Sequence, residues 1–230
     1  MAKQISDYSN QKLPGIWDVL TKRQIEFLKS CSHLQFFKRH EMVYCNGDAP
    51  THLLCLLGGK IKIFKEGIGG RSQITQMIKP IEYFGYRAFF AEELYATSAR
   101  AVDTSVVYMI PVEVIMELIK KNSDLAIFFI KAMAVDLGIA NTRTVNLTQK
   151  HVQGRLAEAL LSLVRTYGVS EDSTLNIYLS REDLASFSNM TASNATRTLS
   201  TFANEKIITV DGRKIKILDE YRLMKISRIG

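Results

Sequence analysis

The stretch from Ser180 to Lys206 holds the residue types whose spacing indicates the most definite chemistry. Serine, asparagine and arginine side chains recur there at helical intervals and form one small, polar face with a single positive charge. That face consists of Ser193, Asn194, Arg197 and Ser200. Side chains of these types bind base edges when a helix lies in the major groove of DNA. The stretch therefore predicts a DNA-recognition helix at residues 191–204.

Two helix-capping signals position this face. Ser180 and Asp183 form a capping-box pattern, which predicts the start of a short helix. Ser188-Asn189 then breaks the helix, and Thr191 is the N-cap candidate of the next one. The second helix would bury Ala195, Leu199 and Phe202. Two helices at this spacing predict a helix-turn-helix.

A basic hairpin follows the two helices. Ile207–Val210 and Lys214–Ile217 alternate in polarity around Asp211-Gly212-Arg213, which is a hairpin signal. Arg213 and Lys214 lie at its tip and are candidate phosphate contacts. The segment from 180 to 217 therefore predicts a winged helix-turn-helix. Two surface helices and a hairpin inside an enzyme domain are the alternative interpretation.

Composition restricts the class of protein. The chain has 230 residues, 47% of them apolar, with a net charge of +7, which favours polyanionic partners. Residues 1–150 hold 19 basic and 14 acidic side chains, and residues 151–230 hold 11 and 9. The first seven residues are too polar for a signal peptide, and Lys131 and Asp136 interrupt the most apolar run, so we expect a cytoplasmic protein without a membrane span. Three scattered cysteines, Cys31, Cys45 and Cys55, predict reduced and mostly buried thiols and no metal site.

The residues before the recognition segment predict a β barrel and a long helix. Two short amphipathic helices are expected within residues 14–30, with Thr21 and Gln24 as a capping box. Short strand-like runs separated by glycines follow from Leu34 to Pro111, as in a jelly-roll-like barrel. Helices are expected at 112–120, 124–149 and 151–165, and an alternating strand at 175–179.

The helix at 124–149 carries an apolar stripe that repeats every three and four residues. The stripe consists of Ala126, Ile130, Met133, Leu137, Ala140 and Thr144. This spacing is typical of helices that pair in a coiled coil, so the stripe is a candidate homodimer interface. The central core helix of a monomer is the alternative.

The order of these elements resembles the CRP/FNR superfamily, the transcription regulators of the cyclic-AMP receptor protein and fumarate-nitrate regulator type. The resemblance covers about residues 15–220. It rests on Leu56–Ile63, Phe84-Gly85, Gly154–Ala157 and Leu179–Ala185. It implies an effector-tuned dimer that binds a two-fold symmetric promoter site and contacts RNA polymerase.

The resemblance also assigns roles within the recognition segment. Arg181 matches a phosphate-contacting arginine, Thr191 a helix-capping residue that donates to a phosphate, and Arg197 an arginine that reaches a guanine. Ser193 stands where family members commonly present a base-reading glutamate. That departure relaxes specificity or transfers it to Asn194, whose amide can pair with adenine.

The effector region departs further from the cyclic-nucleotide binders of the family. Those proteins place a glutamate after the Phe-Gly turn and an Arg-Ser pair about ten residues later, where this chain has Tyr86 and Tyr95-Ala96. A buried phosphate without an arginine is costly, so we expect no tight cyclic-AMP binding. Another anion could use Arg87 and Arg100, although an ion pair of an arginine with Glu92 or Glu93 is at least an equal alternative. The candidate effector pocket comprises Gly85, Tyr86, Arg87, Tyr95, Ala96 and Thr97.

Other cofactors and catalysis find little support in the residues. An iron–sulfur cluster needs four cysteine ligands, and the chain has three cysteines. Haem bound through a histidine stays an alternative, with His33, His40 and His52 as candidates. We find no catalytic triad, carboxylate pair or Gly-rich phosphate loop and expect no enzyme.

The sequence thus predicts an α+β chain of three parts. They are an effector-sensing β-barrel domain at 1–122, a dimerisation helix and hinge at 123–150, and a winged helix-turn-helix DNA-binding domain at 151–230. The predicted function is that of a homodimeric transcription regulator with an unknown effector. A small-molecule sensor whose C-terminal domain binds another protein is the alternative. Nothing in the sequence names the effector, the operator, the regulated genes or the choice between activation and repression.

Overall fold

A computed structural model describes residues 13–230 and divides the chain into two compact units. The first comprises the chain up to Lys65 together with Gln76–Gly138. The second comprises Glu66–Thr75 and Ile139–Gly230. The prediction about a signal peptide concerns the first residues, which lie outside the described part.

The β strands between residues 33 and 111 form two four-stranded sheets. The first has the order β1 (His33–Phe37), β8 (Ser105–Pro111), β3 (His52–Gly58) and β6 (Glu82–Phe84). The second has the order β2 (Met42–Tyr44), β7 (Ser98–Ala101), β4 (Ile61–Glu66) and β5 (Ser72–Ile78). One buried apolar cluster contains side chains of both sheets and forms the interior of the predicted barrel.

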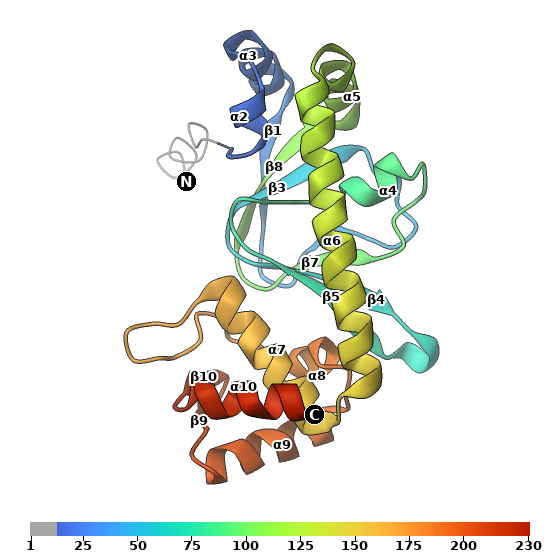
Figure 1. Ribbon diagram of the computed structural model, residues 1–230. Coiled ribbons are helices and arrows are strands. Elements are labelled where there is room, and N and C mark those ends of the chain that lie inside the picture. Colours follow the sequence, from blue (N-terminus) through green and yellow to red (C-terminus); the bar gives the residue numbers. More distant parts are fainter. Residues whose placement is uncertain (1–12) are drawn as a thin grey trace. The chain divides into compact units, whose positions relative to one another are not determined.

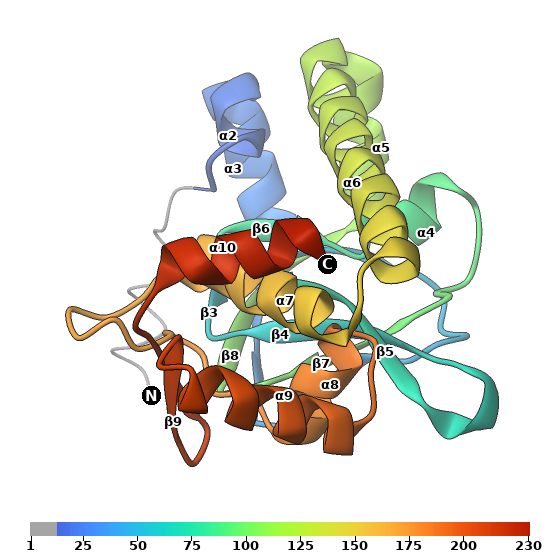
Figure 2. The ribbon, with the colours of Figure 1, turned by 60° about the horizontal axis from the view of Figure 1, so that its bottom comes forward.

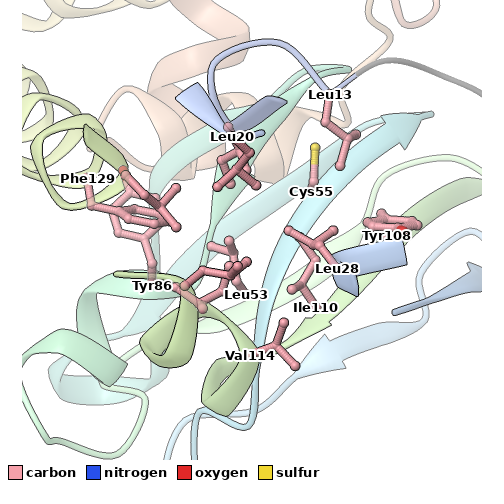
Figure 3. Close-up of a cluster of buried hydrophobic side chains, with 14 of the residues drawn as sticks. Leu13, Leu20, Leu28, Leu53, Cys55, Tyr86, Tyr108, Ile110, Val114 and Phe129 are labelled. Atoms are coloured by element: carbon pink, nitrogen blue, oxygen red, sulfur yellow. The ribbon is translucent and has the colours of Figure 1, made fainter. Parts of the chain in front are cut away.

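Strand β3 is buried on both faces, which explains why its sequence is a continuous apolar run instead of an alternating one. Leu54 and Leu56 belong to the cluster inside the barrel. Leu53, Cys55 and Leu57 belong to a second cluster, outside the barrel, that the helices of this unit cover. Figure 3 shows this second cluster, with Phe129 contributed by helix α6 and Leu28 by helix α3.

Helices surround this outer cluster, and all of them except α4 begin and end near the predicted residues. They are α2 (Ile16–Val19), α3 (Lys22–Cys31), α4 (Tyr86–Phe90), α5 (Val112–Lys121) and α6 (Ser123–Gln149). The capping box at the start of α3 is confirmed, because the Thr21 and Gln24 side chains each accept from the other's backbone N–H. Helix α6 buries only Leu125 and Phe129, which does not agree with the alternative of a monomer's core helix.

The second unit contains the winged helix-turn-helix (Figure 1). Its elements are α7 (Val152–Tyr167), α8 (Arg181–Phe187), α9 (Ala192–Asn204), β9 (Ile208–Asp211), β10 (Lys214–Ile217) and α10 (Glu220–Ile229). The short turn η1 (Ile68–Gly70) lies in the part of the β4–β5 hairpin that belongs to this unit. The predicted hairpin is confirmed, and Gly212 at its tip has a φ of 56°, which suits glycine.

Some sequence-based expectations were wrong. The expected strand at 175–179 does not form, and only single bridges link Val169 to Leu175 and Thr174 to Lys216. Helix α10 was not predicted, and neither were β1, β6 and α4. The thiols are free, as expected, but only Cys55 is buried, whereas Cys31 is half-buried and Cys45 is exposed.

Candidate nucleic-acid interface

Helix α8 and the turn after it form the first half of the helix-turn-helix. The Ser180 hydroxyl oxygen accepts from the Asp183 N–H at 3.0 Å and caps α8. The Ser188 hydroxyl donates to the Leu184 carbonyl oxygen at 2.6 Å, and both residues are buried. Asn189 adopts a left-handed φ of 52°, which ends the helix and directs the chain into α9.

Helix α9, labelled in Figure 2, carries the residues of the predicted polar face. Thr191 Oγ1 accepts from the Asn194 N–H at 3.2 Å, so the predicted N-cap is confirmed. The side chains of Ser193, Arg197 and Ser200 are exposed, and that of Asn194 is half-buried. The opposite face is buried, which fixes the direction in which the polar face points.

Two of these side chains bind each other in the free protein. Arg197 Nη2 donates to Asn194 Oδ1 at 3.0 Å. The Asn194 amide group keeps its two N–H donors and one lone pair of its oxygen. In a bidentate contact of Asn194 with adenine, this oxygen would accept from the adenine amino group and could still accept from Arg197.

The hairpin tip lies against the start of α8. Arg181 is half-buried, and its Nη2 donates to the Gly212 carbonyl oxygen at 2.8 Å. Arg213 and Lys214 are exposed at the same tip. The structure therefore brings three predicted phosphate-contacting cations together, and it gives Arg181 a second task as an anchor of the hairpin.

Arg143 supports this arrangement and was missed by the sequence analysis. Its guanidinium donates to the carbonyl oxygens of Thr75 at 2.6 Å, of Phe187 at 2.9 Å, and of Ile74. Burial lowers the pKa of Arg143 to about 10. One arginine thus joins α6, β5 and the end of α8 within the second unit.

Ser186 adds two hydrogen bonds to the same junction. Its hydroxyl donates to the Ser72 carbonyl oxygen at 2.6 Å and accepts from the Ile74 N–H at 2.9 Å. The acceptors at this junction are main-chain carbonyl oxygens, which no residue type reveals. The one sequence signal for the junction was therefore a lone arginine in an apolar helix.

The candidate effector pocket of the first unit contains two stacked tyrosines. The rings of Tyr44 and Tyr95 lie 3.8 Å apart with an interplanar angle of 14°, and both are buried. A Cβ atom on Gly85 would lie 3.0 Å from the Tyr95 hydroxyl. Burial raises the pKa of Tyr95, so its hydroxyl is neutral. A neutral, packed ring stands where the phosphate of a cyclic nucleotide would need a cation.

The other predicted pocket residues do not supply that cation. Arg87 is exposed and forms an ion pair with Glu93 at 3.0 Å, which is the alternative that the sequence left open. Tyr86 is buried, and its hydroxyl donates to Asp136 of α6 at 2.6 Å. Ala96 and Thr97 are half-buried. The described residues of this region do not fit a cyclic-nucleotide phosphate.

The predicted stripe on α6 is exposed in part. Ile130 and Leu137 are 55% and 62% exposed, and Ala140 and Thr144 are also exposed. Ala126 is half-buried, and Met133 packs against the apolar cluster of its own unit. Water solvates large apolar side chains with this exposure poorly.

Helix α6 is long and apolar enough to cross a membrane by length and composition. Its charged side chains nevertheless contact the protein or the solvent. Asp136 accepts from Tyr86, Arg143 binds main-chain carbonyls, and Lys131 is exposed. These contacts agree better with a helix that packs along its own chain.

Comparison with known protein families matches both units. Residues 34–122 match the cyclic nucleotide-binding domain, and residues 154–226 match the Crp-like helix-turn-helix domain. Together the two matches cover more than half of the chain and occur in the order that the fold shows.

Similar proteins cover most of the chain. A CRP-like cAMP-activated global transcriptional regulator of Mycobacterium tuberculosis is 23% identical over 84% of this chain and 87% of its own. The anaerobic regulatory protein of Bacillus subtilis is 24% identical over 86% and 84%. The structure of FixK2 from Bradyrhizobium japonicum is similar with a TM-score of 0.77 and 19% identity over 85% of this chain and 96% of that one. The structure of TTHA1359, a CRP/FNR regulator from Thermus thermophilus, is similar with a TM-score of 0.71 and 22% identity over 85% of this chain and 98% of that one.

Proposed function

The chain belongs to the CRP/FNR superfamily of DNA-binding transcription regulators, and we propose that it acts as a homodimer that binds a two-fold symmetric promoter site. The exposed polar face of the capped helix α9 carries this proposal. In a symmetric dimer, each α9 would read one half-site, and the half-sites would lie about one turn of DNA apart. The β-barrel domain at 1–122 would then sense the effector. The helix at 123–150 would form the dimer axis, and the domain at 151–230 would bind the DNA.

We infer that α6 forms the dimer interface. Ile130 and Leu137 are seven residues apart and more than half exposed, so a second copy of α6 would cover them through a symmetric contact. Ala140 and Thr144 would continue the contact, whereas Ala126 and Met133 are partly used by their own unit.

Base reading would rest on few side chains. Arg197 is the candidate for a guanine, and the neighbouring Asn194, to which it donates, is the candidate for an adenine. The hydroxyls of Ser193 and Ser200 could bond either base, guanine or adenine. Thr191 would add a phosphate contact beside the cations of the hairpin tip and of the start of α8.

The effector is proposed to be something other than cyclic AMP. The stacked pair of Tyr44 and Tyr95 and the ion pair of Arg87 support this, because neither leaves a buried cation for a phosphate. We also propose that the protein contacts RNA polymerase in the cytoplasm and is not an enzyme, as the family implies.

Selection of bound sequences from random DNA, with and without cell extract, tests the proposal. A palindromic consensus is expected, and extract should change the affinity if an effector is present. Arg197→Ala should then reduce the binding free energy for the consensus DNA by about 1–3 kcal/mol. The reduction for random DNA should be smaller. Equal losses on both DNAs would refute the reading role of Arg197.

Native mass spectrometry tests the dimer. Leu137→Glu should shift the protein toward monomer because it places two carboxylates in an apolar interface. Lys131→Gln, on the same helix and also exposed, is the control and should leave the dimer intact. An unchanged dimer in Leu137→Glu would place the interface elsewhere.

A second candidate function follows from the small net charge of residues 151–230, which include 11 basic and 9 acidic side chains. Its helix-turn-helix would then bind a protein, and the barrel would remain a small-molecule sensor. Gel-shift experiments at low salt decide between the two functions, since a protein-binding module would retain no DNA.

A further inference from the structure

An open groove of about 740 Å³ lies beside the recognition helix in the second unit. Its walls are α9, α10 and the first turn of α7, which Figures 1 and 2 show close together. Helix α10 was not foreseen from the sequence, so neither was this groove. Arg197 lines it and belongs to the proposed reading face as well.

The groove carries a net positive charge. Its lining includes the basic side chains of Arg197, Arg222 and Lys225 and one acidic side chain, that of Glu205. Arg222 is held in place, because it donates to the Glu205 carbonyl oxygen at 2.9 Å and to its carboxylate at 3.3 Å. Lys225 is exposed and pairs with no acidic residue among residues 13–230.

The proposed function creates a need for such cations. The recognition helix α9 contains one basic residue, Arg197, and non-specific affinity for DNA depends on the number of neutralised phosphates. The hairpin tip and Arg181 supply part of that number. Further cations close to α9 would add to that number and raise the affinity at physiological salt.

Helix α10 has a suitable place for them. The major groove is about 12 Å wide, so a helix that fills it has a phosphate strand on each side. Helix α10 packs on α7 and forms the other wall of the open groove beside α9, on the side where such a strand would run. The start of α7 lies in the same groove, where the His151 N–H donates to the Gly230 oxygen at 2.6 Å.

We propose that this groove receives the sugar–phosphate backbone that borders the major groove, with Lys225 and Arg222 as phosphate contacts. The inference rests on the proposed function and adds α10 to the DNA-binding surface. Phosphate contacts carry no base information, so these residues would raise affinity on every sequence alike. Arg197 would differ, because its contact depends on the base.

The test compares two charge-neutralising variants of α10. Lys225→Gln removes a cation of the groove, and Arg228→Gln removes an exposed cation of the same helix that does not line it. Equilibrium binding to a consensus duplex and to a random duplex is measured between 50 and 200 mM salt. Lys225→Gln should reduce the slope of log affinity against log salt by about 0.9 per protomer and weaken both duplexes about equally. Arg228→Gln should keep the wild-type slope.

The possible results separate this inference from the proposed function. If the wild type binds no DNA at low salt, the function fails and the groove contact fails with it. If the wild type binds and Lys225→Gln keeps its slope, the function stands and the groove serves another partner, such as a protein. Equal reductions in both variants would indicate a general charge effect and would also overturn the inference.

Discussion

Glu158 of α7 should make the stability of the second unit depend on pH. Its carboxylate accepts from Ser227 of α10 at 2.6 Å, from Arg165 at 2.7 Å and from Lys150 at 3.1 Å. Burial by itself raises the pKa of Glu158, but these three donors outweigh burial and lower the pKa from 4.5 to about 2. The ionised carboxylate therefore stabilises the contact between α7 and α10.

The magnitude follows from the two pKa values. A change from 4.5 to about 2 corresponds to at most ~3 kcal/mol. The Glu158 side chain is 29% exposed and that of Arg165 is 62% exposed, so solvent screening reduces this figure to about 1–2 kcal/mol. Because the folded-state pKa is lowered, the stabilisation is fully present above pH 4.5 and is lost as the pH falls toward 2.

Glu158→Gln is the perturbation that isolates this charge. The amide can still accept from Ser227, but it carries no charge. At pH 7 the variant should be less stable than the wild type by about 1–2 kcal/mol, and the difference should shrink by roughly two fifths at pH 3.5. Glu171→Gln, which neutralises an exposed carboxylate of the same unit, is the matched control and should lack this pH dependence.

Urea unfolding with two probes provides the measurement. Circular dichroism follows the helices of both units, whereas fluorescence of Trp17, the one tryptophan, follows the first unit. The change should appear in the circular dichroism transition and leave the Trp17 transition in place. A stability difference that is zero at pH 7, or that stays constant down to pH 3.5, would refute the assigned role of the charge.

Three further predictions concern both units. Arg143→Met should destabilise the second unit by about 3 kcal/mol in urea unfolding, because three carbonyl oxygens lose a charged donor, and it should weaken binding to consensus DNA. Gly59→Ala should lower the free energy of unfolding by about 2–4 kcal/mol, because its φ is 88° and a Cβ there would lie 2.4 Å from a backbone oxygen. Gly47→Ala is the control, because its φ is 91° but the space around it is open, and it should lower the free energy of unfolding by about 1 kcal/mol. Tyr86→Phe should lower the free energy of unfolding measured by Trp17 fluorescence by about 1–2 kcal/mol, because the tyrosine hydroxyl donates to a carboxylate. An unchanged midpoint of the Trp17 transition would contradict that bond.

The sequence predicted features whose determinants are close together in the chain. The N-caps Ser180 and Thr191 were identified correctly because each bonds an N–H three residues later, a spacing that the residue types reveal. The hairpin at Gly212 followed from the need for a positive φ. The strand expected at 175–179 failed because alternating polarity indicates a half-buried segment but not a partner for its backbone.

The sequence by itself determined the order of barrel, long helix and helix-turn-helix, the caps and the polar face of α9, because all of these depend on local hydrogen bonds and on periodicity. Only the tertiary structure decided which distant groups meet. Arg143 binds a carbonyl 68 residues away, Glu158 binds a hydroxyl 69 residues away, and Tyr95 stacks on Tyr44. Such pairs depend on the path of the whole chain, since a side chain can be matched by any donor, acceptor or ring that the fold brings to it. For the same reason, the groove between α9 and α10 became visible only once both helices had been placed.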